Sequence, residues 1–130
     1  MRILVDVFRA CDDDTIPAAD TVKNWIALAA NAAGHSRDIE VSVRIVDADE
    51  SRALNQEYRG KDTPTNVLSF PFAAPPEVDS DHLGDLVICA QVVKREAQQQ
   101  GKKERDHWAH MVVHGVLHLR GFDHQADAQA

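Results

Sequence analysis

The sequence lacks several features that would assign it to a specialised class of protein. Its two cysteines, Cys11 and Cys89, are far apart and belong to no CxxC pair, which argues against a disulfide framework. No apolar run approaches the roughly 18–20 residues of a membrane helix. The start of the chain does not resemble a signal peptide, because its short apolar part alternates with charge and leads into acidic residues. We therefore expect reduced thiols in a cytoplasmic protein that does not contact a membrane.

An excess of basic residues is also missing. The chain has 14 Lys and Arg against 21 Asp and Glu, and the resulting net charge of −7 argues against a general nucleic-acid binder. The charge is uneven, since residues 1–50 carry ten acids and five bases and residues 51–130 carry the other eleven acids and nine bases. A local basic cleft in the second part of the chain is therefore compatible with the acidic whole.

What the chain does contain fits one globular domain over residues 1–130. An apolar fraction of 44% and a charged fraction of 27% are ordinary for such a domain. Alternating apolar and polar residues predict strands, and apolar positions spaced three and four apart, closed by glycines, predict helices. The strands are expected at 2–9, 39–46, 67–72 and 84–90, and the helices at 16–34, 47–58, 91–101 and 104–121. This order predicts an α+β fold with a small mixed sheet packed with helices.

The stretch HGVLHLRGFDH carries the clearest chemical pattern. His114 and His118 are four residues apart, so a helix places them on one face, where two imidazoles can bind one metal ion. We expect Gly121 to end this helix and the following turn to bring His124 in as a third ligand. Three protein ligands leave a position for water or substrate, which is typical of one catalytic zinc ion per chain. His110 is interpreted either as a partner of a ligand or as a packed residue, and His107 is expected to be exposed.

The spacing of these histidines equals that of the metzincin peptidases, HExxHxxGxxH. The residue that serves those peptidases as general base is a glutamate, and here this position is Gly115. A glycine cannot accept a proton from metal-bound water, so the pattern keeps the metal ligands and argues against peptidase chemistry.

A second stretch, EYRGKDTPTNVLSF, contains Arg59 at a predicted helix end. A guanidinium there can hold a phosphate through two parallel hydrogen bonds, although an arginine at a loop is often simply solvated. Asn66 and Ser69 could bond a substrate or cap turns. Asp85 and Asp123 are candidates either for structural roles or for hydrogen bonds to a histidine ligand.

Together the two stretches resemble the YbeY family of bacterial proteins. The family motif H-G-x-L-H-L-x-G-[YF]-D-H matches HGVLHLRGFDH, and a second family hallmark is similar to YRGKDTPTNVLSF followed by the strand GDLVIC. The order of elements agrees from about residue 2 to residue 127. Here the chain stops at QADAQA, whereas the family usually continues into an acidic helix, so we expect that helix to be missing or truncated.

The resemblance implies a single-strand-specific, metal-dependent endoribonuclease. Such a protein acts in 3′-end maturation of small-subunit ribosomal RNA and in ribosome quality control, with the small ribosomal subunit and ribosome-assembly proteins as partners. It implies zinc bound by His114, His118 and His124, and it matches Arg59 to the family's functional arginine. Two alternatives stay open at this stage. One is a zinc peptidase or other hydrolase, and the other is a non-catalytic ribosome-assembly factor in which zinc orders the C-terminal turn.

Overall fold

The computed structural model describes residues 2–32, 34, 38–72 and 82–129, and it describes side chains as far as Leu119. Within these ranges the chain forms a four-stranded sheet and four helices, so the predicted α+β class with a small mixed sheet is confirmed. The elements are β1 (Ile3–Arg9), α1 (Ala19–Ala32), β2 (Ile39–Val46), α2 (Ala48–Arg59), β3 (Val67–Pro71), β4 (His82–Cys89), α3 (Ala90–Gln100) and α4 (Glu104–Gln129). None of the helices described is long and apolar enough to cross a membrane.

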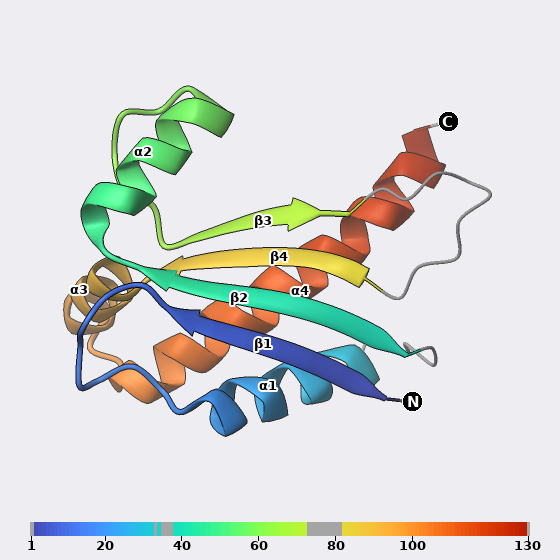
Figure 1. The fold of residues 1–130 in the computed structure, drawn as a ribbon, viewed down its shortest axis with the longest axis horizontal. Coiled ribbons are helices and arrows are strands. Elements are labelled where there is room, and N and C mark those ends of the chain that lie inside the picture. Colours follow the sequence, from blue (N-terminus) through green and yellow to red (C-terminus); the bar gives the residue numbers. More distant parts are fainter. Residues whose placement is uncertain (1, 33, 35–37, 73–81, 130) are drawn as a thin grey trace.

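The sheet has the strand order β1-β2-β4-β3. β2 pairs in parallel with both β1 and β4, whereas β3 pairs antiparallel with β4. Parallel neighbours need long crossover connections, and α1 supplies the one between β1 and β2. Figure 1 shows α4 crossing behind the strands, with α1 and α3 beside it. β3 is the last strand in the order and is therefore an edge strand. This position explains how it accommodates Pro71 without losing a central ladder bond.

The main core lies between the sheet and α4. Val43 of β2 and Leu86 of β4 are buried there beneath Trp108 and Val116 of α4. Trp108 is the largest fully buried side chain, so this contact removes much apolar surface from water. Because one stripe of α4 packs on the sheet, the opposite stripe is exposed, and this exposed stripe carries histidines.

Helix α2 has both of the end signals expected from the sequence. The side chain of Asp47 accepts a hydrogen bond of 2.9 Å from the backbone N–H of Glu50, which caps the first turn. Gly60 adopts a left-handed conformation, with φ of 71°, and closes the last turn. Arg59 is therefore the final residue of α2, at a fixed position where the chain turns toward β3.

The expected end of the last helix at Gly121 is wrong. α4 continues through this residue to Gln129 and has 26 residues in all. A glycine permits a turn without requiring one, and inside a helix it costs only about 1 kcal/mol relative to alanine. His124 thus follows His118 on the same helix in this structure, rather than lying on a turn beyond it.

The junction of β3, β4 and α4 depends on Gly84. This glycine has φ of 155°, next to an irregularity in the pairing of β2 with β4. A Cβ atom here would lie 2.6 Å from the backbone oxygen of Phe70 and 2.7 Å from Cδ2 of Leu119. Only glycine therefore allows the edge strand and α4 to approach β4 this closely.

Candidate active site

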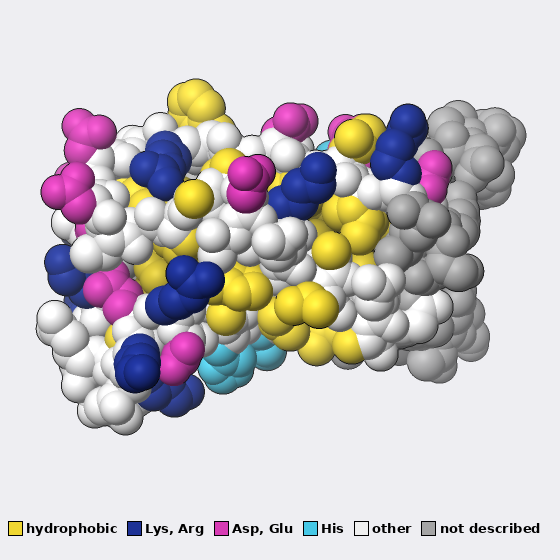
Figure 2. Space-filling view, turned by 90° about the horizontal axis from the view of Figure 1, so that it is seen from below, with side chains coloured by type: hydrophobic (Ala, Val, Ile, Leu, Met, Phe, Trp, Pro, Cys, Tyr) yellow, Lys and Arg dark blue, Asp and Glu magenta, His cyan; other side chains and the backbone are white. Residues whose placement is uncertain are grey.

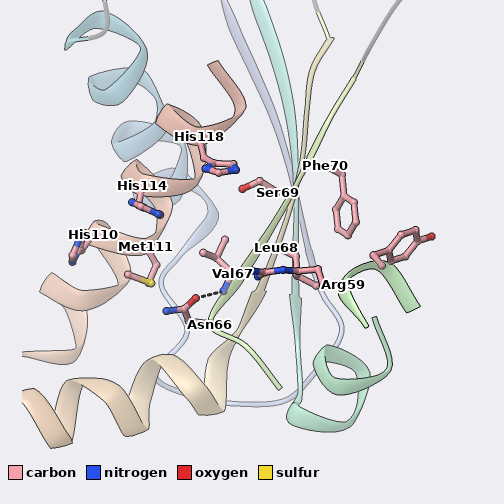
Figure 3. Close-up of a pocket in the computed structure, with 11 residues that line it drawn as sticks. Arg59, Asn66, Val67, Leu68, Ser69, Phe70, His110, Met111, His114 and His118 are labelled. Atoms are coloured by element: carbon pink, nitrogen blue, oxygen red, sulfur yellow. Dashed lines mark hydrogen bonds between the residues drawn. The ribbon is translucent and has the colours of Figure 1, made fainter. Parts of the chain in front are cut away.

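A cavity of about 680 Å³ opens between α4, β3 and the end of α2. Its polar lining comes from Arg59 of α2, Asn66 and Ser69 at β3, and three histidines of α4 (Figure 3). All of these residues except His110 come from the two stretches that the sequence analysis singled out. The fold thus brings HGVLHLRGFDH and YRGKDTPTNVLSF together at one site.

The three histidines follow one exposed stripe of α4. His110, His114 and His118 are four residues apart, and all three are exposed. Their ring centroids are 6.3 Å apart for the first pair and 6.4 Å apart for the second. Figure 2 shows most of the visible histidine atoms gathered at one margin of the molecule, whereas basic and acidic side chains are mixed over the rest of the described part of that face. The shared helical face predicted for His114 and His118 is confirmed.

Gly115 has a packing role on the other side of α4. It is buried, and a Cβ atom at this position would lie 2.9 Å and 3.2 Å from the two methyl carbons of Leu86. A side chain here would therefore point into the sheet and not into the cavity. The position that holds the general base of a metzincin faces the core of this protein, so a side chain there would have to displace the buried Leu86.

Arg59 reaches from the end of α2 across β3 toward the histidine side of the cavity (Figure 3). Its side chain is exposed, and no acidic side chain among the described residues pairs with it. Two other arginines differ in this respect, because Arg52 is bonded to Asp62 at 2.7 Å and Arg44 is bonded to Glu50. The guanidinium of Arg59 is thus left with its donors directed to an incoming group.

His110 has an environment that favours its neutral form. Its pKa is lowered, first by partial burial and then by electrostatic interaction with Lys102, His107 and His114, against an opposing effect of the Glu96 carboxylate. A neutral imidazole keeps a lone pair on one ring nitrogen, so His110 can accept a hydrogen bond or a proton from a group in the cavity.

His107 is not exposed as the sequence analysis expected. Its side chain is 2% exposed, and its Nε2 atom lies 3.0 Å from a carboxylate oxygen of Glu96. It precedes His110 by three residues, and this step turns the ring toward α3 and away from the cavity. Glu96 itself was missed, because nothing in the α3 sequence marks it as different from the other polar residues of that helix.

The other candidates lie away from the cavity or outside the described side chains. Asp85 belongs to the face of β4 opposite α4, where it is 3.3 Å from His82. The structure therefore does not bring it to the histidines of α4. The side chains of Asp123 and His124 lie beyond the part of the chain whose side chains are described. Among the described residues, no group of three possible ligands could hold a metal ion.

The donor set of α4 nevertheless fits part of a zinc site. His114 and His118 present two neighbouring imidazoles, with ring planes 30° apart, to the same cavity. A continuous helix would place His124 roughly 9 Å along the axis from His118 and about 120° around it. Convergence of all three rings therefore needs α4 to end near Gly121.

Comparison with known proteins agrees with this assembly of motifs. The family model described as "Endoribonuclease YbeY" matches residues 9–130, which includes every residue that lines the cavity. The chain belongs to the YbeY family. Membership places it among RNA-cleaving hydrolases, and the resemblance noted from the two motifs is confirmed.

Individual relatives support the same assignment. An endoribonuclease YbeY from Alkalilimnicola ehrlichii is 56% identical over 117 residues, covering 88% of this chain and 70% of its own. Another from Halorhodospira halophila is 58% identical over 117 residues, covering 88% and 75%. The solution structure of a Thermotoga maritima protein is similar in fold, with a TM-score of 0.57 and 25% identity over 90% of this chain and 71% of its own.

Proposed function

We propose that this protein is a zinc-dependent endoribonuclease that cleaves single-stranded RNA. Its membership of the YbeY family supports the reaction. The observation that carries the proposal is the cavity itself, which is lined by the imidazoles of His114 and His118 and by Arg59, a residue with no acidic partner in the part of the chain that the structure describes. An arginine is suited to a phosphodiester, and imidazoles are suited to zinc.

The biological role we propose is 3′-end maturation of small-subunit ribosomal RNA and a part in ribosome quality control. Its partners would be the small ribosomal subunit and assembly proteins in the cytoplasm. The free thiols of Cys11 and Cys89 are compatible with that compartment.

The residues of the cavity divide the chemistry among them. His114 and His118, together with His124, would hold one zinc ion, which when bound supplies a Lewis acid next to the scissile phosphate. Arg59 would donate two parallel hydrogen bonds to the two non-bridging phosphate oxygens and offset the charge that develops there. His110 would accept a proton from the attacking hydroxyl group or water through its free ring nitrogen.

The residue Gly115 argues against a peptidase. The residue that would be the general base is Gly115, and a larger residue there would meet Leu86 in the core. A deciding experiment incubates the purified protein with single-stranded RNA, duplex RNA and unstructured peptide, with and without a chelator. Chelator-sensitive cleavage of single-stranded RNA alone supports the proposal, and cleavage of peptide alone refutes it. A 2′,3′-cyclic phosphate product would mark attack by the RNA's own 2′-hydroxyl, and a 5′-phosphate end would mark attack by water.

Replacement of Arg59 by lysine tests the phosphate contact. Lysine keeps the charge but cannot form two parallel hydrogen bonds, so we expect Arg59→Lys to lower kcat/KM on single-stranded RNA by roughly 10- to 100-fold. Zinc content and unfolding free energy should not change, because the guanidinium is exposed and pairs with no acidic side chain that the structure describes. Arg52→Lys, at a surface ion pair on the same helix, is the matched control. Equal activity of Arg59→Lys and the wild-type protein would refute the contact.

Replacement of Gly121 by alanine tests whether zinc needs the helix to end there. Alanine favours a continuous helix by about 1 kcal/mol, so Gly121→Ala should weaken zinc binding by roughly fivefold if the three histidines converge on one ion. Competition with a chromophoric chelator measures the affinity. Unchanged or tighter zinc binding would show that the ligands do not depend on a break at this glycine.

A further inference from the structure

A hydrogen-bonded chain of three side chains lies behind the wall of the cavity. It joins Asn66 just before β3, Glu96 on α3 and His107 on α4. The amide nitrogen of Asn66 is 3.1 Å and 3.3 Å from the two carboxylate oxygens of Glu96, and Nε2 of His107 is 3.0 Å from Oε1 of Glu96. Only Asn66 lines the cavity. The proposed chemistry does not use Glu96 or His107, yet three separate elements supply this chain.

Asn66 is held in one orientation by its partners. Its Oδ1 atom accepts a hydrogen bond of 2.7 Å from the backbone N–H of Val67 (dashed line in Figure 3). Its backbone oxygen accepts another, of 2.9 Å, from the N–H of Cys89. The side-chain amide cannot flip, because a backbone N–H only donates and the carboxylate of Glu96 only accepts. One N–H of the amide therefore points to Glu96, and the second has no partner among the described residues, on a side chain whose residue lines the cavity.

Glu96 is held in turn by His107. The imidazole is 2% exposed, and its Nδ1 atom is buried without a partner among the described residues. A ring tautomer with its hydrogen on Nε2 donates to Glu96 and leaves only the lone pair of Nδ1 unbonded. The carboxylate thus has a fixed donor on one side and the Asn66 amide on the other. A bonded carboxylate polarises that amide and strengthens the donor on its free N–H.

We propose that Asn66 donates this N–H to a phosphate oxygen of single-stranded RNA, and that Glu96 and His107 are positioning residues that aim it. The inference rests on the proposed function, since it names a second phosphate contact in the cavity that contains Arg59. Arg59 comes from the end of α2 and Asn66 from the segment just before β3, so the two donors approach the substrate from different parts of the fold. Glu96 does not line the cavity. Asn66 would therefore lie between the negative charge of Glu96 and the substrate.

A double-mutant cycle separates positioning from general structural support. The variants Asn66→Ala, Glu96→Ala and the double mutant are compared for kcat/KM on single-stranded RNA and for binding of a fluorescent 2′-O-methyl RNA oligonucleotide. We expect each single variant to lose roughly tenfold or more, and the double mutant to be no worse than Asn66→Ala. Glu96→Gln keeps an oxygen that can accept from Asn66, so it should recover most of the loss. Gln99→Ala, at an exposed position of α3, is the matched control.

The outcomes distinguish this inference from the function on which it rests. Independent, multiplicative losses in the cycle, or a Glu96→Gln variant as poor as Glu96→Ala, would overturn the positioning role. If the wild-type protein binds the oligonucleotide without cleaving RNA, the proposed function fails and the binding cycle still decides the role of Asn66. If it does not bind the oligonucleotide, both proposals fail. Thermal unfolding of each variant, and the Asn66 side-chain amide signals in NMR spectra, show whether a loss comes from disrupted packing.

Discussion

Replacement of His114 by alanine is expected to abolish both zinc binding and RNA cleavage. The ring lies in the middle of the exposed histidine stripe, with His110 and His118 at centroid distances of 6.3 Å and 6.4 Å. Loss of one of three ligands removes the charge that would stabilise the transition state, so we expect kcat/KM to fall by at least roughly a hundredfold. The unfolding free energy of the metal-free protein should hardly change, since the imidazole is exposed.

The matched control for this variant is His82→Ala, which removes a histidine from the opposite face of the sheet. Metal content is measured on purified protein by elemental analysis, and cleavage is measured on the same samples. Stoichiometric zinc in His114→Ala would refute the ligand assignment. Residual cleavage equal to that of the wild-type protein, in zinc-free samples, would show that the metal has no part in the reaction.

Replacement of Gly84 by alanine is expected to have the largest effect on stability. The backbone at φ of 155° is strained for any residue with a Cβ atom, and the nearest obstacle is the backbone oxygen of Phe70, at 2.6 Å, which cannot rotate away. Strain and overpacking together should lower the unfolding free energy by about 2–4 kcal/mol. Urea denaturation followed by circular dichroism measures this change.

A second glycine supplies the control for that prediction. Gly101 also has positive φ, at 65°, but nothing lies within 4 Å of the place its Cβ would occupy. Gly101→Ala should therefore cost only about 1 kcal/mol, from the left-handed backbone alone. Equal losses in the two variants would contradict the close approach of β3 and Leu119 to Gly84. The comparison also concerns the cavity, because β3 and α4 form two of its walls.

Local patterns predicted the elements well, because each depends on residues close in sequence. The alternation in residues 39–46 and the capping pair Asp47 and Glu50 define β2 and the start of α2 as the structure has them. Gly60 ends α2 as expected, whereas Gly121 does not end α4. A glycine near a helix end is a weak signal, since its cost of about 1 kcal/mol within a helix is easily offset by the rest of the helix.

Such local patterns could not predict contacts between segments that are distant in sequence. The burial of His107 depends on α3 lying next to α4, and the carboxylate of Glu96 that receives it is eleven residues away in sequence. Asp85 looked like a neighbour of a histidine ligand, but its place in β4 turns it to the opposite face of the sheet. The chemistry of a side chain determines which groups it can bond. The packing of helices and strands determines which of these groups it contacts.

By itself, the sequence determined the four strands and four helices, the shared face of His114 and His118, and the family to which the chain belongs, because spacing and motif are properties of the chain alone. Only the tertiary structure decided that Arg59 and Asn66 meet the histidines in one cavity, since α2, β3 and α4 are brought together by the strand order β1-β2-β4-β3. It also showed that Gly115 faces the core, where a side chain would press on the methyl groups of Leu86. That contact comes from close packing between distant segments, which no local pattern contains.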